Sequence, residues 1–139
     1  MRTIIVGVDG SDASIDAARH AGRLAADLDA ALVVVHARQL PVVSGPSAGD
    51  TGTVESIWKS VEEAALLRVT EALAPFGVRW KFEVGVGEPA TLLERAAQQH
   101  EAEMIVVGSR GHTATQRLLL GSVSTRLVHH ADRPVLVVR

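Results

Sequence analysis

Three glycines near the end of the chain are spaced in a way that could bind phosphate. Gly108 and Gly111 stand three apart after an apolar run, and nine residues separate Gly111 from Gly121. Ser122 follows at the expected start of a helix. Glycine lets the main chain turn sharply and approach a ligand closely. The first N–H groups of a helix lack partners and favour an anion. The spacing therefore predicts a cradle of main-chain amides for negatively charged oxygens.

A second loop has the chemistry to complete such a site. The stretch Gly7-Val8-Asp9-Gly10-Ser11 follows the first apolar run of the chain. The Asp9 carboxylate suits a ribose hydroxyl, an adenine edge reached through its neighbours, or a bridging Mg²⁺ better than it suits a phosphate oxygen. In open α/β sheets, ligands bind outside the carboxyl ends of the strands, where the winding reverses. We expect both loops to lie at that edge.

The elements that must position these loops are visible as alternating strand and helix patterns. Apolar runs typical of strands occupy the ranges 3–8, 31–37, 78–84, 104–108 and 134–138. Helical patterns occupy the ranges 12–28, 54–76, 88–100 and 123–130. Most of the strand runs are continuously apolar, as in a parallel sheet covered on both faces, whereas 78–84 alternates and indicates an edge strand. The order predicts a single doubly wound α/β domain over residues 1–139.

The segment 38–53 has a different composition from the rest. It holds two prolines and three glycines and shows no periodicity. Loops of this length are uncommon in compact domains and are usually functional or mobile. We expect this loop to close over a ligand or to change shape with it.

Composition narrows the classes of protein that the chain can belong to. There is no cysteine, which excludes disulfides and thiolate metal sites, and the net charge is −2 with both signs spread along the chain. This balance argues against a nucleic-acid partner. No apolar run approaches the roughly 20 residues of a membrane span, and the apolar start is too short for a secretory signal. A cytoplasmic location without a membrane partner is the expectation.

Other motifs in the sequence have plain structural explanations beside functional ones. Residues 85–90, Gly-Val-Gly-Glu-Pro-Ala, match a dinucleotide fingerprint, but Glu88 would repel a pyrophosphate and Pro89 lacks an N–H donor, so a turn is favoured. The chain has neither a Walker-type loop nor a Gly-x-Ser-x-Gly nucleophile motif. Arg110 is either solvated or balances phosphate charge. His112 follows Gly111 and could approach the phosphates.

These motifs, together with longer segments, resemble the universal stress protein family. That family's nucleotide-binding signature is Gly-x-x-Gly, nine residues, then Gly followed by Ser or Thr. The resembling segments are IIVGVDGSDAS, GEPATLLERAAQQHEAEMIVVGSRG, LLLGSVSTRLVHHA and ADRPVLVVR. The likeness covers the whole chain and points to the single-domain, ATP-binding kind.

The resemblance implies a fold, a ligand and a set of site residues. The fold is a five-stranded parallel sheet in the order 3-2-1-4-5 with helices on both faces, an α/β/α sandwich. The ligand is an adenine nucleotide, usually ATP with Mg²⁺, with Asp9 near the adenine–ribose end and the candidate Mg²⁺ contact through the nucleotide. Ala37 presents its backbone to adenine. The residues expected to line the nucleotide are Gly7, Val8, Asp9, Gly10, Ala37, Val107, Gly108, Arg110, Gly111, His112, Gly121, Ser122, Val123 and Ser124.

Assembly and function follow as expectations of the same kind. The last strand, Val135–Val138, would be an apolar sheet edge, which invites pairing with a second copy, and the family also dimerises there. The leading hypothesis is a stress-response regulator that acts through nucleotide occupancy. Asp9 and His112 are the only candidate bases beside the site, so an enzyme would show weak ATP hydrolysis or adenylyl transfer at most. AMP or a cyclic nucleotide as ligand, and a nucleotide-independent interaction module, stay as alternatives.

Overall fold

The computed structural model of the protein describes residues 1–39, 51–109 and 121–139, with residues 51–53 described by their backbone alone. Strands and helices alternate along the chain, as the sequence predicts. In chain order they are β1 (Thr3–Gly7), α1 (Asp12–Leu28), β2 (Ala31–Arg38), α2 (Thr51–Leu73), a 3₁₀ turn η1 (Ala74–Phe76), β3 (Trp80–Val86), α3 (Pro89–Gln99), β4 (Met104–Gly108), α4 (Ser122–His130) and β5 (Val135–Val138). The predicted loop 38–53 is shorter than expected at its far end, because α2 already begins at Thr51. Residues 40–50 of that loop lie outside the described residues.

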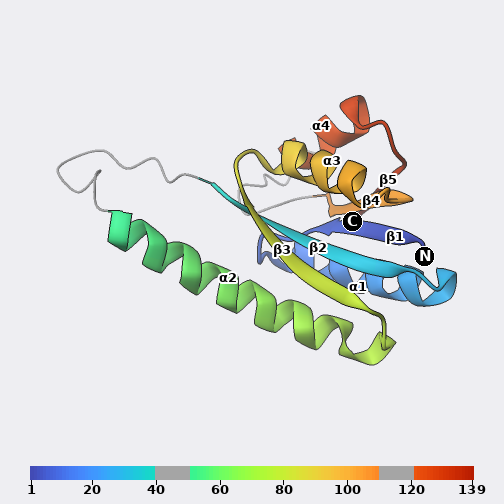
Figure 1. Ribbon diagram of the computed structural model, residues 1–139, viewed down its shortest axis with the longest axis horizontal. Coiled ribbons are helices and arrows are strands. Elements are labelled where there is room, and N and C mark those ends of the chain that lie inside the picture. The colour runs from blue at the N-terminus through green and yellow to red at the C-terminus, as the bar shows by residue number, and fades with distance from the viewer. Residues whose placement is uncertain (40–50, 110–120) are drawn as a thin grey trace.

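All the strands form one parallel sheet in the order β3-β2-β1-β4-β5, which confirms the predicted fold. Helices α1 and α2 cover one face, and α3 and α4 cover the other (Figure 1). The chain winds from β1 outward to β3 and then returns to the other side of β1 through β4. The winding therefore reverses between β1 and β4, which is where an open α/β sheet offers its ligand crevice.

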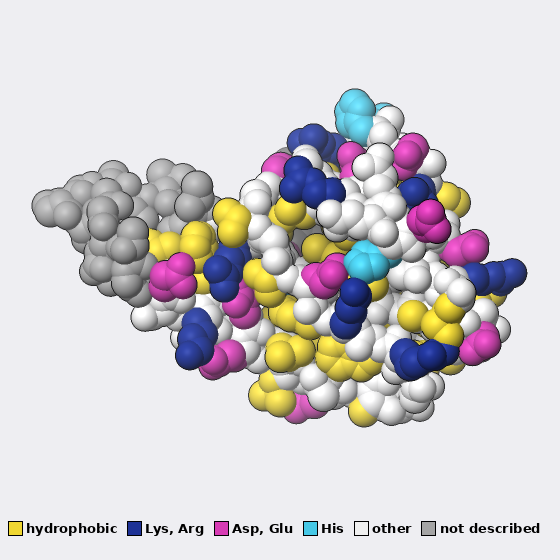
Figure 2. Space-filling model, viewed as in Figure 1, with side chains coloured by type: hydrophobic (Ala, Val, Ile, Leu, Met, Phe, Trp, Pro, Cys, Tyr) yellow, Lys and Arg dark blue, Asp and Glu magenta, His cyan; other side chains and the backbone are white. Residues whose placement is uncertain are grey.

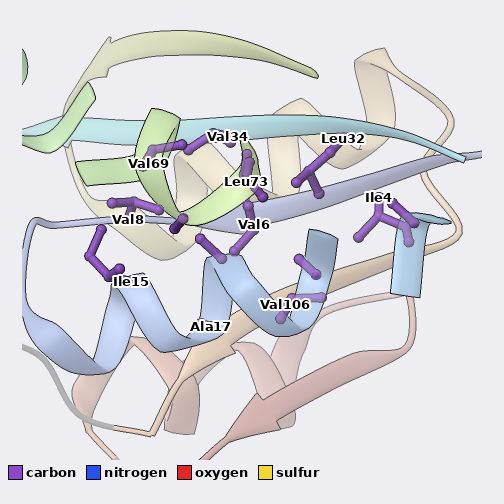
Figure 3. Packing of buried hydrophobic residues seen from close by; sticks show 14 of the residues in the cluster. Ile4, Val6, Val8, Ile15, Ala17, Leu32, Val34, Val69, Leu73 and Val106 are labelled. Atoms are coloured by element: carbon purple, nitrogen blue, oxygen red, sulfur yellow. The ribbon is translucent and has the colours of Figure 1, made fainter. Parts of the chain in front are cut away.

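The core consists of two apolar clusters, one on each face of the sheet. Ile4 and Val6 of β1 point toward α1 and α2, whereas Ile5 between them points toward α3 and α4. Figure 3 shows the first cluster, in which strand side chains meet Ile15 and Ala17 of α1. Because successive strand residues face opposite sides, each run must be apolar at every position to serve both clusters. This explains the continuous apolar runs of the central strands.

Helix α2 contributes to the core with its C-terminal half. Val69 and Leu73 are buried, but Ile57 is 51% exposed and Val61 is 43% exposed. The apolar pattern over 54–76 predicts the helix, which runs from Thr51 to Leu73 and continues as η1, and its first half carries apolar side chains that are exposed. The N-terminal turns of α2 extend past the described strands of the sheet (Figure 1).

Strand β3 lies at one edge of the sheet. β3 pairs with β2 alone, as expected of an edge strand, but spans 80–86 rather than 78–84, and Val84 is exposed. Basic and acidic side chains are interspersed on the face shown in Figure 2, without a patch of one sign. No helix in the described part of the chain combines the length and apolar character that a bilayer crossing requires.

Candidate functional site

The predicted site residues that the structure describes gather at one edge of the sheet. Strands β2, β1 and β4 are neighbours, so their carboxyl ends bring Ala37, the loop after Gly7, and Gly108 to the same side. The start of α4 joins them because the N–H of Gly121 donates a hydrogen bond to the carbonyl of Ser109. Arg110, Gly111 and His112 lie outside the described residues.

The loop between β1 and α1 is held by a compact network of side chains. The Asp9 Oδ1 accepts hydrogen bonds from the backbone N–H of Ser11 at 2.9 Å and from its hydroxyl at 2.5 Å. The Ser11 Oγ in turn caps α1 by accepting from the N–H of Ser14 at 3.2 Å. Ser14 closes the network, since its Oγ donates to the Ser11 carbonyl and accepts from the Asp9 N–H. One oxygen of the candidate ligand-binding carboxylate is therefore committed to shaping the loop.

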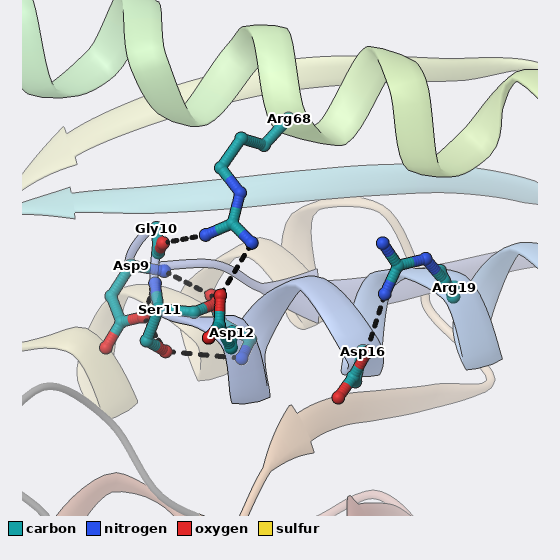
Figure 4. Close-up of polar contacts among 8 residues, drawn as sticks. Asp9, Gly10, Ser11, Asp12, Asp16, Arg19 and Arg68 are labelled. Carbon is teal, nitrogen blue, oxygen red and sulfur yellow. Dashed lines mark hydrogen bonds and ion pairs between the residues drawn. The ribbon is translucent and has the colours of Figure 1, made fainter.

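An arginine from another helix braces the same loop, and sequence reasoning missed it. Arg68 of α2 donates from Nη1 to the Gly10 carbonyl at 2.6 Å and from Nη2 to Asp12 Oδ1 at 2.7 Å (Figure 4). Gly10 has φ of +87°, a conformation that glycine adopts readily and other residues rarely do. The loop thus combines a backbone geometry that favours glycine with a partly buried hydrogen bond from a cationic side chain to the Gly10 carbonyl.

The N-terminus of α4 has the features of an anion site. Its N-cap is Gly121, with φ −76° and ψ 175°, and no side chain caps the helix. The first N–H to bond back is that of Thr125, which donates to the Gly121 carbonyl at 3.0 Å. The N–H groups of Ser122, Val123 and Ser124 make no hydrogen bond to any other part of the chain that the structure describes. Such unpaired amides and the helix dipole favour a negative group at this end.

The hydroxyl groups at this helix start differ in what they can offer. Ser122 is exposed, whereas Ser124 is only 1% exposed. The Ser124 Oγ donates to the Gly121 carbonyl at 3.1 Å. That hydroxyl is therefore used inside the fold and does not point to a phosphate. Ser124 would contribute through its N–H.

The start of α3 shows what a filled helix N-terminus looks like in the same molecule. The Glu88 carboxylate accepts from the N–H groups of Ala90 at 3.1 Å and Thr91 at 2.9 Å. Desolvation raises the pKa of Glu88, but the hydrogen bonds from Thr91 and Ala90 outweigh it and hold this pKa below its usual range. The chain's own carboxylate occupies the place that a pyrophosphate would need, and Gly87 and Glu88 form the turn and the cap that join β3 to α3.

Two of the predicted glycines serve helix packing at the strand ends. A Cβ added at Gly108 would lie 2.9 Å from the carbonyl oxygen of Ala13, in the first turn of α1. One added at Gly7 would lie 2.9 Å from Leu93 Cδ1 of α3. Glycine at these positions therefore lets the helices approach the site edge closely, a reason distinct from contact with a ligand.

Val8 and Val107, two of the predicted site residues, are buried in the core. Each is 4% exposed. The Val8 N–H donates to the Val35 carbonyl at 3.0 Å, and its carbonyl accepts from His36 Nδ1 at 2.9 Å. Because a carbonyl only accepts, the Nδ1 of this buried histidine carries a proton. His36 is a support of the site edge that sequence reasoning did not single out.

The end of β2 is fixed to the first half of α2. Arg38 donates to both carboxylate oxygens of Glu62, and its guanidinium lies 5.2 Å from the centre of the Trp58 ring. Trp58 Nε1 donates to the Gln39 carbonyl at 3.1 Å. The hydrogen bond from Arg38 holds the pKa of Glu62 below its usual range. Side chains thus attach helix α2 both to the end of β2 and to the β1–α1 loop.

Fold and site together define a doubly wound α/β domain whose glycine-lined loops and uncapped helix start meet at the switch point of the sheet. The model of the universal stress protein family matches residues 1–139. The chain is 34% identical over 139 residues to a universal stress protein of Methanocaldococcus jannaschii, covering 99% of this chain and 82% of that one. The chain belongs to the universal stress protein family.

Solved structures agree with this assignment. The universal stress protein UspA from Lactobacillus plantarum superposes with a TM-score of 0.85 at 26% identity, covering 99% of this chain and 97% of that one. A universal stress protein crystallised in complex with cAMP matches with a TM-score of 0.70 at 28% identity, covering 99% and 96%.

Proposed function

We propose that the protein binds an adenine nucleotide at the carboxyl edge of β1 and β4 and acts as a stress-response regulator through occupancy of that site. The observation that carries the proposal is the start of α4, which has no side-chain cap and is tied to Ser109 at the end of β4, next to the switch point of the sheet. The relative solved with cAMP supports an adenine nucleotide as the ligand. Helices α1 and α3, by contrast, have their N-termini capped by Ser11 and Glu88.

The parts of the nucleotide would be divided among the strand ends. The N–H groups of Ser122, Val123 and Ser124 would hold phosphate oxygens, with Arg110, Gly111 and His112 completing the cradle. Ala37 at the end of β2 would face the adenine, and the Asp9 carboxylate would face the ribose. In this arrangement the amides serve any phosphate-bearing adenine nucleotide. ATP with Mg²⁺ is the proposed ligand within that class, the ion being held chiefly through the nucleotide because Asp9 Oδ1 is already bonded to Ser11.

A substitution at the helix cap separates ligand binding from folding. Gly121→Asp would place a carboxylate at the N-cap, where aspartate stabilises helices by a few tenths of a kcal/mol or more relative to glycine. The same carboxylate would repel phosphate. We expect Gly121→Asp to keep its thermal stability yet lose at least about tenfold in affinity for AMP and ATP, measured by calorimetry.

Matched controls test whether the loss comes from charge. Gly121→Asn has nearly the same shape and cap chemistry without the charge, so its loss should be much smaller. Adenosine, which has no phosphate, should bind the wild type and Gly121→Asp equally. Equal affinity of the wild type and Gly121→Asp for AMP would contradict the proposed phosphate site.

The last strand supports a proposal about assembly. β5 pairs with β4 on one side and forms an edge of the sheet in the chain described. Leu136 in its middle is 39% exposed. An apolar strand edge can pair with another chain. We propose that two copies associate through Val135–Val138.

A further inference from the structure

The β1–α1 loop depends on a contact from an element far away in the sequence. Arg68 on α2 reaches across to the Gly10 carbonyl, and Figure 4 shows its guanidinium directed at the loop that carries Asp9. The helix around Arg68 is firmly placed, because Ala65 and Val69 beside it are buried in the first core cluster. The backbone that carries Arg68 is therefore held in place by the core.

The two contacts of Arg68 differ in how strongly they hold the loop. The hydrogen bond to the Gly10 carbonyl is partly buried and 2.6 Å long. The Asp12 side chain is 94% exposed, so its ion pair with Arg68 is screened by water and contributes little. The effect of Arg68 should therefore come mainly from the Gly10 carbonyl.

That carbonyl controls the geometry of Asp9. Gly10 lies between Asp9 and Ser11, and Asp9 Oδ1 accepts from both the N–H and the hydroxyl of Ser11. A rotation of the Gly10–Ser11 peptide would turn the Ser11 N–H away from Asp9 and weaken the network that aims the carboxylate. Because glycine has no Cβ, such rotations are accessible at Gly10 unless something holds the carbonyl.

We infer that Arg68 is a positioning residue of the nucleotide site, which keeps the β1–α1 loop in the shape that binds ligand. The inference rests on the proposed nucleotide binding. In this inference Arg68 acts through its hydrogen bond to Gly10. Because α2 is also tied to the end of β2 by Arg38 and Glu62, the helix supports two of the strand ends that form the site.

The experiment compares four variants by AMP affinity at 0.1 M and 0.5 M NaCl. We expect Arg68→Met to raise Kd about tenfold, as when the competent loop shape falls to a tenth of the population. Arg68→Lys keeps the charge and can donate once to Gly10, so it should recover most of the affinity.

Two further variants are controls. Asp12→Asn leaves the Gly10 contact intact and should change Kd less than about twofold. Arg19→Met removes a similar charge from the exposed Arg19–Asp16 pair on α1 (Figure 4) and should have no effect.

Salt and hydrogen exchange separate positioning from simple charge. Screening weakens long-range attraction of the phosphate, so a loss caused by charge alone would shrink at 0.5 M NaCl, whereas a positioning defect should persist. Without nucleotide, the amides of residues 9–14 should exchange faster in Arg68→Met than in the wild type. Both results together with the affinity loss support the inference.

Three outcomes would overturn it. If the wild type binds AMP and Arg68→Met binds equally well, Arg68 does not position the site and the proposed function stands. If the loss vanishes at high salt, Arg68 acts only as a charge. If the wild type binds no AMP at millimolar concentration, both the proposed function and this inference fail.

Discussion

At the residue scale, glycines shape the site edge, because a larger residue would not fit the space at one position and rarely adopts the backbone conformation at the other. Gly108 lets the first turn of α1 lie against the end of β4, and Gly10 turns the loop with a positive φ. These requirements concern the fold and hold whether or not a ligand is bound. The serine hydroxyls of the loop are equally committed, because Ser11 and Ser14 bond to each other and to Asp9.

Substitution of Gly108 tests this packing. In Gly108→Ala the new Cβ would meet the Ala13 carbonyl oxygen at 2.9 Å, and backbone atoms cannot move aside as a side chain can. We expect a loss of about 1–3 kcal/mol in the free energy of unfolding, measured in urea. Gly10→Ala has no such clash and should cost about 1–2 kcal/mol through its positive φ. A Gly108→Ala protein as stable as the wild type would refute the close approach of α1.

At the scale of elements, the helices differ in how their ends are satisfied. The N-termini of α1 and α3 are closed by the chain's own side chains, and that of α4 begins at a glycine with no side-chain cap. Helix α2 has another role, since it is tied by side chains to the end of β2 and to the β1–α1 loop. One helix therefore has an N-terminus without a side-chain cap, where we propose the anion site, and another is tied to the loops around it.

The tie between α2 and β2 should make stability depend on pH. The hydrogen bond from Arg38 lowers the pKa of Glu62 in the folded state, so the unfolded chain binds more protons as the pH falls. This contribution is present above the ordinary glutamate pKa of about 4.3 and is lost on acidification through the folded value. We expect Glu62→Gln to be less stable than the wild type at pH 7, with the difference shrinking at pH 3, in urea unfolding at both pH values.

A neighbour on the same helix provides the control for this prediction. Glu63→Gln alters an exposed carboxylate next to Glu62 and should leave the stability difference between pH 7 and pH 3 unchanged. If Glu62→Gln showed the same pH dependence as the wild type, the ion pair would not hold α2 to the strand end.

At the scale of the whole molecule, a five-stranded open sheet leaves two edges, β3 and β5. β3 carries the charged residues Lys81 and Glu83, which discourage pairing, whereas β5 has no charged side chain between Val135 and Val138. The difference favours β5 as the edge that meets a second copy.

The dimer is tested by one substitution on that edge. Leu136→Glu would add charge to an apolar strand and should shift the protein from about 29 kDa, twice the chain mass of 14.7 kDa, to the mass of one chain in analytical ultracentrifugation. Leu67→Glu, on an exposed apolar position of α2, should leave the mass unchanged. A wild type that sediments as one chain at micromolar concentration would contradict the proposed dimer.

The sequence predicts the fold well because its signals are periodic and local. Continuous β-branched runs and the alternation of strands with helices lead to the parallel sheet, and the resemblance supplies the strand order. Periodicity does not reveal whether another element covers a face, so the pattern over 54–76 could not show that Ile57 and Val61 are exposed. Nor does an arginine within a helical pattern reveal which distant carbonyl it reaches. Arg68 and His36 became visible only when the fold brought α2 and β2 to the β1–α1 loop.

The most direct test of the nucleotide site is a titration of the labelled wild-type protein with AMP, followed by the backbone amide signals in NMR. We expect saturable shifts at Ser122, Val123 and Ser124 and in the Asp9–Ser11 loop. Adenosine should shift the loop and leave the α4 amides nearly unchanged, because it has no phosphate. Saturable shifts confined to another part of the molecule, or no shifts at millimolar AMP, would contradict the central claim that this edge of the sheet holds an adenine nucleotide.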